Sequence, residues 1–129
     1  MEEQEKKKIM LVDDEVGFTT LLRMNLEKTG RFEVSIENEA ASAIASIRTA
    51  KPDLVLLDIV MPGKDGGDIL AEMQDDATLS RIPVVMLTAL VAREEMSADA
   101  VAQSEAMTVL PKPVELEKLM AVIESHLGE

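Results

Sequence analysis

Five side chains suited to metal, acid–base or nucleophilic chemistry stand at the ends of short apolar runs. Asp13 and Asp14 follow one run, Asp58 and Thr88 follow two others, and Lys112 comes one proline after a further run. If these residues meet, carboxylates about 4 Å apart repel each other by roughly 4 kcal/mol per pair at an effective dielectric constant of about 20. A cation must then lie among them.

The composition indicates which cation suits such a cluster. The chain has no Cys and a single His, His126, so the ligands would all be oxygens, the donor set of a hard divalent cation such as Mg²⁺. Mg²⁺ together with the Lys112 ammonium and the Thr88 hydroxyl complements a phosphoryl group. Asp58 could then attack phosphorus and form an acyl phosphate.

The apolar runs have the length and composition of β-strands. Those at 9–12, 54–57 and 84–87 are apolar without alternation, as strands buried on both faces are. The run at 32–36 alternates polar and apolar residues, and the run at 107–110 precedes Pro111, so both are expected at the edges of a parallel sheet. Because the carboxyl ends of parallel strands all lie at the same end of the sheet, the reactive side chains are expected to converge there.

Helical patterns separate the strands. They comprise Phe18, Leu21, Leu22 and Leu26 before Gly30; a segment capped by Asn38 and ending before Pro52; a segment after Gly66 and Gly67; a weak pattern within about 91–103; and Leu116, Leu119, Met120, Ile123 and Leu127 near the end. Right-handed crossovers through these helices predict a three-layer α/β sandwich.

The net charge and the length of the chain argue against several classes of partner and location. The formal net charge is −12, which disfavours nucleic acid and acidic membrane surfaces as partners. The 129 residues suffice for one hydrophobic core, so residues 1–129 are expected to form a single domain. No apolar run reaches the roughly 18 residues of a membrane span and the first residues lack a signal-peptide pattern, so the expected compartment is the cytoplasm.

Each reactive residue also has a simpler explanation when it is taken alone. Asp13 or Asp14 could cap the first helix, and Asp58 could open a turn before Pro62. His126 fits a polar residue that finishes the last helix, where the helix dipole favours a cation. A cap or turn role can explain any one of these residues. Five such roles at the same end of one sheet would be an unlikely coincidence, so we expect a functional site.

Four segments occur in a fixed order: Val12-Asp13-Asp14-Glu15, Asp58-Ile59-Val60-Met61-Pro62 with Gly66, Thr88-Ala89, and Leu110-Pro111-Lys112-Pro113. Together they resemble the receiver domain of two-component response regulators, along about residues 8–127. The resemblance implies a doubly wound, flavodoxin-like (βα)5 fold with a parallel sheet of order 2-1-3-4-5. It also implies a phosphorylatable signalling switch, with self-catalysed phosphorylation, instead of an ordinary enzyme.

The resemblance assigns roles to the acidic residues. Asp58 would accept a phosphoryl group from a phosphohistidine on a sensor histidine kinase or a histidine phosphotransfer protein. Asp14 and Asp58 would bind Mg²⁺ directly, Asp13 mostly through water, and Val60 through its backbone carbonyl.

Lys112 and Thr88 are implied to contact the phosphoryl oxygens. The bond from Lys112 to Pro113 resembles the family's cis peptide, and Thr88 would be the switch hydroxyl. Val109 stands where the family usually has Tyr or Phe, so the switch would work without aromatic reorientation. Glu105 replaces a customary glycine, which could displace the fourth helix.

Two apolar residues predict a slow loss of phosphate. In the resembling family, the side chains two residues after the phosphoacceptor and two after the switch threonine orient or exclude the attacking water, and here they are Val60 and Leu90. Neither can hydrogen-bond a water molecule, so slow autodephosphorylation is expected.

Three other interpretations remain open at this point. A Mg²⁺-dependent phosphohydrolase of the haloacid dehalogenase type also uses Asp, Thr and Lys on a parallel sheet, but it carries its two acids as D-x-D after the first strand. The chain could be a receiver fragment of a larger hybrid kinase or regulator, or an inert receiver-like scaffold. Because nothing follows Glu129 in this sequence, output is expected through contact with a downstream protein.

Overall fold

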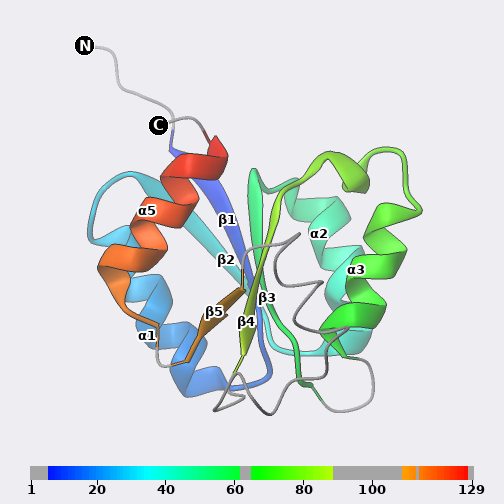
Figure 1. The fold of residues 1–129 in the computed structure, drawn as a ribbon, viewed down its shortest axis with the longest axis horizontal. Coiled ribbons are helices and arrows are strands. Elements are labelled where there is room, and N and C mark those ends of the chain that lie inside the picture. The colour runs from blue at the N-terminus through cyan, green and yellow to red at the C-terminus, as the bar shows by residue number, and fades with distance from the viewer. Residues whose placement is uncertain (1–5, 62–64, 89–108, 113, 128–129) are drawn as a thin grey trace.

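A computed structural model describes residues 6–61, 65–88, 109–112 and 114–127 of the chain. Along these residues, helices follow each of the five strands except β4, whose following residues are not described (Figure 1). In chain order the elements are β1 (Lys7–Val12), α1 (Val16–Glu27), β2 (Phe32–Glu37), a 3₁₀ turn (Ala40–Ser42), α2 (Ala43–Ala50), β3 (Leu54–Asp58), α3 (Gly66–Gln74), a second 3₁₀ turn (Leu79–Arg81), β4 (Val84–Thr88), β5 (Val109–Pro111) and α5 (Leu116–Leu127).

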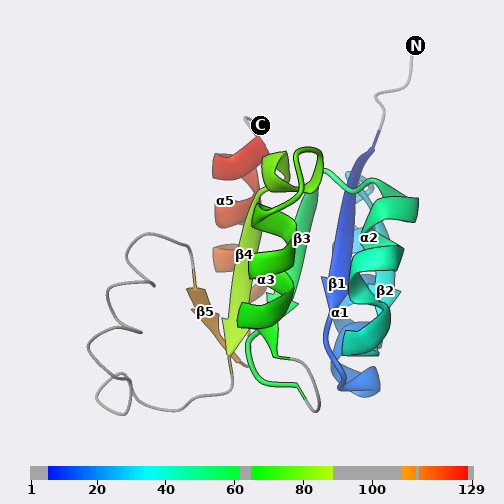
Figure 2. The ribbon, with the colours of Figure 1, turned by 90° about the vertical axis from the view of Figure 1, so that its right-hand side faces the viewer.

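The strands form one parallel sheet of order β2-β1-β3-β4-β5. Helices α1 and α5 cover one face and α2 and α3 cover the other, as the two perpendicular views in Figures 1 and 2 show. The predicted three-layer sandwich, strand order and edge strands are confirmed. Pro111 lies within β5, at the sheet edge, where its missing N–H costs no interior ladder bond.

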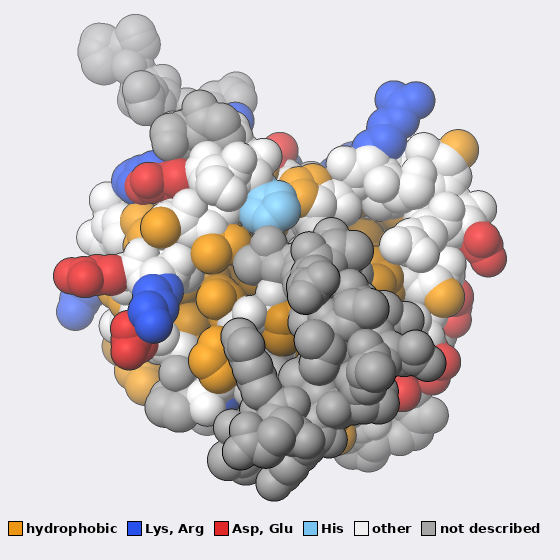
Figure 3. Space-filling view, viewed as in Figure 1, with side chains coloured by type: hydrophobic (Ala, Val, Ile, Leu, Met, Phe, Trp, Pro, Cys, Tyr) orange, Lys and Arg blue, Asp and Glu red, His pale blue; other side chains and the backbone are white. Residues whose placement is uncertain are grey.

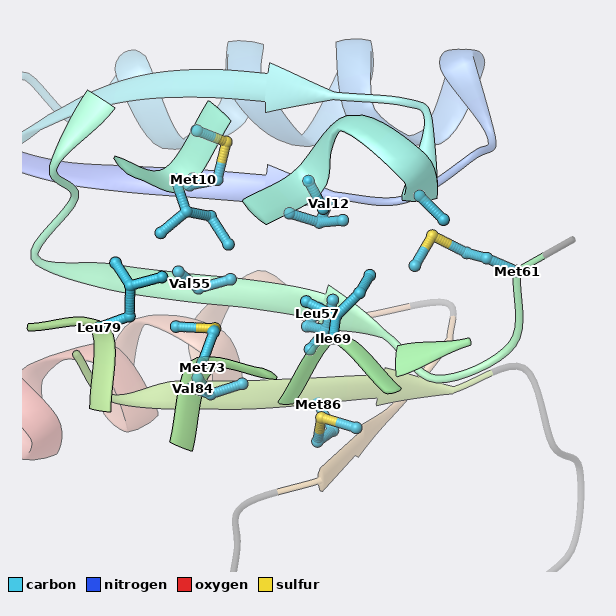
Figure 4. Packing of buried hydrophobic residues seen from close by; sticks show 13 residues of the cluster. Met10, Val12, Val55, Leu57, Met61, Ile69, Met73, Leu79, Val84 and Met86 are labelled. Carbon is cyan, nitrogen blue, oxygen red and sulfur yellow. The ribbon is translucent and has the colours of Figure 1, made fainter. Parts of the chain in front are cut away.

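Two apolar clusters hold the layers together, one on each face of the sheet. Alternate residues of each buried strand point to opposite faces, so Met10 and Val12 pack toward α2 and α3, whereas Ile9 and Leu11 pack toward α1 and α5. Figure 4 shows the first cluster, in which Met10 and Met86 fill the space between sheet and helices. These methionines are core residues, as expected for adaptable apolar side chains.

Two local predictions change in the structure, and a third lies outside the described residues. Leu21 is 59% exposed and lies outside the buried stripe of α1. Asn38 does not cap α2: its side-chain amide instead donates to the Asp13 carbonyl at 2.7 Å and to the Thr19 hydroxyl at 3.1 Å. Because Asp13 and Thr19 are buried, their oxygens need hydrogen-bond donors. The Asn38 amide serves these two oxygens and does not cap the helix. The predicted fourth helix, within 91–103, lies outside the described residues.

Helix α5 runs antiparallel to the strands, from the end of the sheet at which the strands finish back to the end at which they begin (Figure 1). His126 is in its last turn and is exposed on the face shown in Figure 3. This position matches the expected helix-end residue. In the described part of the chain, no helix has the length and apolar character needed to cross a membrane.

Candidate functional site

The register of the sheet brings the first and third strand ends together. Val12 of β1 pairs with Leu57 of β3, so Asp13 and Asp58 are the next residues along two neighbouring strands. Asp14 joins them, and one carboxylate oxygen from each of the three residues lies within 4.8 Å of the others. The predicted convergence of these acids is therefore present in the structure.

Two hydrogen bonds and an ion pair position Asp13. Its Oδ1 accepts the backbone N–H of Glu15 at 2.9 Å, and Asn38 binds its carbonyl. Its Oδ2 is buried and accepts no hydrogen bond of good geometry, but it lies 2.7 Å from Lys112 Nζ. The buried oxygen is thus aimed at a cation.

Asp58 ends β3 with only 3% of its surface exposed. Its Oδ1 accepts the Val60 N–H at 3.3 Å, and its Oδ2 lies 3.6 Å from Lys112 Nζ. Burial, and next the charge of Asp13, raise the pKa of Asp58 to about 6, against the lowering effect of Lys112. One ammonium does not compensate this acidic cluster, so the site can accommodate a further positive charge.

Lys112 enters the site from the end of β5. Its backbone N–H donates to the Thr88 carbonyl at 2.8 Å, which fixes the residue beside β4. Although burial lowers the pKa of Lys112, its contacts with Asp13 and Glu15 outweigh this effect and hold that pKa above its ordinary value. The side chain is 8% exposed and remains an ammonium at neutral pH.

The structure describes three of the other predicted site residues. Thr88 is the buried last residue of β4, and its neighbour Leu87 pairs with Asp58. Val60 is 57% exposed just beyond Asp58. Val109 is partly buried and packs against the α2–α3 side of the sheet. Ala89, Leu90, Glu105 and Pro113 lie outside the described residues.

Three residues of the site have roles that the sequence patterns do not predict. Glu15 and Phe18 contact Lys112, and Asn38 supports Asp13. The first contact joins residues 97 positions apart, so no local spacing rule identifies it.

The structure argues against a helix-cap role for Asp13 and Asp14. The N-cap of α1 is Glu15, with no side-chain cap hydrogen bond. Three clustered carboxylates that share one ammonium instead fit a metal ion bound through oxygen.

Replacing Asp14 with asparagine should weaken metal binding while stabilising the metal-free protein. The change removes one anionic ligand, for which we expect a loss of about tenfold or more in Mg²⁺ affinity. It also relieves repulsion with Asp58, so the melting temperature without metal should rise by a few degrees. Calorimetric Mg²⁺ titration and thermal unfolding would check both; lower stability with unchanged affinity would exclude Asp14 from the metal site.

Gly66 allows α3 to begin against the end of β3. A Cβ at this position would collide with the Asp58 carbonyl oxygen and lie 2.9 Å from the Ile59 Cα. Gly66→Ala should therefore destabilise the protein by about 1–3 kcal/mol in urea unfolding. Gly17→Ala is the matched control, because nothing lies within 4 Å of a Cβ there. Equal stabilities of the two variants would contradict the close approach.

Comparison with known proteins agrees with this geometry. The family model described as the response regulator receiver domain matches residues 9–124. Response regulator PleD of Caulobacter vibrioides is 35% identical over 118 residues, which make up 92% of this chain and 25% of PleD. The DNA-binding response regulator MtrA of Mycobacterium tuberculosis is 31% identical over 124 residues, which make up 95% of this chain and 51% of MtrA.

A solved structure shows the same similarity over nearly the whole chain. The bacteriophytochrome response regulator AtBRR has a TM-score of 0.75 and 31% sequence identity, covering 97% of this chain and 94% of its own. The chain spans about a quarter to a half of the length of PleD and MtrA. Because the family model covers residues 9–124, nearly all of the described fold, this chain belongs to the response regulator receiver domain family.

Proposed function

We propose that this domain is a signalling switch in which Asp58 accepts a phosphoryl group from a phosphohistidine on a sensor histidine kinase or histidine phosphotransfer protein. A carboxylate oxygen of Asp58 attacks phosphorus, the P–N bond breaks, and the released imidazole nitrogen takes up a proton from solvent. The observation that supports this best is a buried carboxylate at a strand end, 3.6 Å from an ammonium and beside two further acids.

Mg²⁺ is the proposed cofactor. Asp13, Asp14 and Asp58 would hold it, together with the backbone carbonyl of Val60, and the ion would neutralise charge on the phosphoryl oxygens. With a pKa of about 6, Asp58 is already mostly a carboxylate at pH 7, and a second positive charge would bring this raised pKa down. Asp58 would then be a ready nucleophile without a separate general base.

Lys112 and Thr88 are the proposed contacts of the phosphoryl group. Thr88 is buried at the end of β4, and its backbone carbonyl accepts the hydrogen bond of the Lys112 N–H. A movement of one residue therefore displaces the other. Val109 packs against the core and offers no aromatic ring to reorient. We propose that phosphorylation biases two arrangements of these strand ends, with Thr88 as the switch residue.

The proposed output is contact with a downstream protein, in the cytoplasm. MtrA is named as DNA-binding, but this chain matches about half of MtrA and has a net charge of −12. Acidic surfaces repel nucleic acid backbones, so we assign no nucleic acid contact to this domain itself. We likewise treat residues 1–129 as a single functional domain.

The phosphohydrolase alternative is not favoured. The acids after β1 are the adjacent pair Asp13 and Asp14, and the solitary Asp58 follows β3. The family match covers the same residues. In this family the domain acts in signalling, and self-catalysed phosphorylation of this chain remains part of the proposal.

Incubation with acetyl phosphate and Mg²⁺ tests the proposal by intact mass spectrometry. The unaltered protein should gain one phosphoryl group, and Asp58→Asn should gain none. Asp75→Asn removes the same charge from an exposed position and should be labelled normally. Equal labelling of the Asp58→Asn variant would overturn the assignment.

A further inference from the structure

One short segment of the chain holds the Lys112 ammonium. Its Nζ lies 2.7 Å from Asp13 Oδ2 and 2.8 Å from Glu15 Oε1, but 3.6 Å from Asp58 Oδ2. The centroid of the Phe18 ring is 4.5 Å from the same nitrogen, within the range of a cation–π contact. Lys112 is therefore bound mainly by residues 13–18 and only distantly by the proposed phosphoacceptor.

The backbone around Glu15 directs its side chain to this position. Its N–H donates to Asp13 Oδ1 at 2.9 Å, and its carbonyl accepts the Thr19 N–H at 3.1 Å as α1 begins. Glu15 is the N-cap residue, yet its side chain makes no capping hydrogen bond. The carboxylate is consequently available to Lys112.

The Glu15 contact differs from the Asp13 contact in one respect. Glu15 lies outside the cluster of three carboxylates that fits a metal ion. Its ion pair with Lys112 thus uses no oxygen that a metal would need. The Glu15 side chain is 60% exposed, so solvent and salt reach this ion pair directly.

We propose that Glu15 is a positioning residue that holds Lys112 away from Asp58 in the resting domain and competes with the phosphoryl group for the ammonium. This inference rests on the proposed function. For Lys112 to contact phosphoryl oxygens on Asp58, its ion pair with Glu15 must lengthen or break. Glu15 therefore opposes formation of the phosphorylated arrangement.

The expected size of the effect follows from the exposure of the pair. An exposed ion pair contributes little to stability, so Glu15→Gln should tighten binding of a phosphoryl mimic by about two- to fivefold. The effect should depend on salt, because the Debye length falls from about 10 Å at 0.1 M to about 3 Å at 1 M ionic strength. A purely structural role of Glu15 would not produce this salt dependence.

Beryllofluoride binding in the presence of Mg²⁺, followed by NMR titration of the full chain, tests the proposal. Glu15→Gln should bind the mimic more tightly than the unaltered protein, and the difference should shrink as NaCl is raised. Glu15→Asp keeps the charge but is one methylene shorter, so it should resemble Glu15→Gln. Glu39→Gln is the matched control: it removes an exposed acid that has no contact with Lys112, and it should bind like the unaltered protein.

The outcomes separate this inference from the proposed function. Failure of the unaltered protein to bind beryllofluoride would overturn the proposed function itself. Normal binding with equal affinities for Glu15→Gln, Glu39→Gln and the unaltered protein would overturn only the role of Glu15. Weaker binding by Glu15→Gln, or a difference that does not change with salt, would also contradict that role.

Discussion

Asp58→Asn should stabilise the metal-free protein by about 3 kcal/mol at pH 7, because each unit of pKa shift corresponds to about 1.4 kcal/mol. The pKa of Asp58 rises from 3.8 to about 6 on folding, through burial first and the charge of Asp13 second. The folded state thus binds a proton more tightly than the unfolded state. The ionised carboxylate opposes folding, and asparagine removes this penalty.

The pH dependence of this difference has a definite sign. Below pH 3.8 the carboxyl group is protonated in both states and costs nothing, and the cost grows as the pH rises from 3.8 to about 6. The advantage of Asp58→Asn in urea unfolding should therefore be about half as large at pH 5 as at pH 7. Asp75→Asn, at an exposed position, should show neither effect. A destabilised Asp58→Asn variant, or an advantage independent of pH, would contradict the buried, repelled carboxylate.

The phosphorylated domain should lose its phosphate slowly, and Val60→Asn should speed that loss by up to about 10²-fold, the lower end of what a positioned acid–base group contributes. Val60 lies just beyond Asp58 with 57% of its surface exposed. Its isopropyl group can neither donate to nor accept from a water molecule. Water that attacks the aspartyl phosphate must then reach phosphorus without help from this position.

The decay is measured by following the phosphorylated mass after the donor is removed. Leu21→Asn is the matched control, because it replaces an equally exposed apolar side chain, on α1, with the same polar one. It should leave the lifetime unchanged. Loss of phosphate from the unaltered protein within seconds, together with a slower loss from Val60→Asn, would show that Val60 does not limit access of water.

Strand ends were predictable from the sequence because they follow from local composition. Uninterrupted apolar runs predicted β1, β3 and β4, and the residue after each run then had to lie at the common carboxyl edge. The same reasoning placed β2 and β5 at the sheet edges, as the structure confirms. Asp13, Asp58 and Thr88 could therefore be brought together without knowing any side-chain contact.

Contacts that depend on tertiary geometry were beyond the reach of sequence patterns. Asn38 has the residue type of a helix cap, and only the nearby carbonyl of Asp13, 25 positions away, shows why its amide turns inward. Glu15 stands in the motif beside Asp13 and Asp14, but its partner is Lys112 at the far end of the chain. Such pairings depend on how β1 and β5 lie relative to each other, which no local spacing records.

Reduction of the phosphorylated protein with borohydride, followed by peptide mass spectrometry, tests most directly whether Asp58 is the phosphoacceptor. Borohydride reduces an aspartyl phosphate to homoserine, so the reduced residue marks the acyl phosphate itself. After treatment with acetyl phosphate and Mg²⁺, homoserine should be found at position 58 and nowhere else. Homoserine at position 13 or 14, or phosphate retained on His126 with position 58 unchanged, would contradict the assignment of Asp58 as the phosphoacceptor.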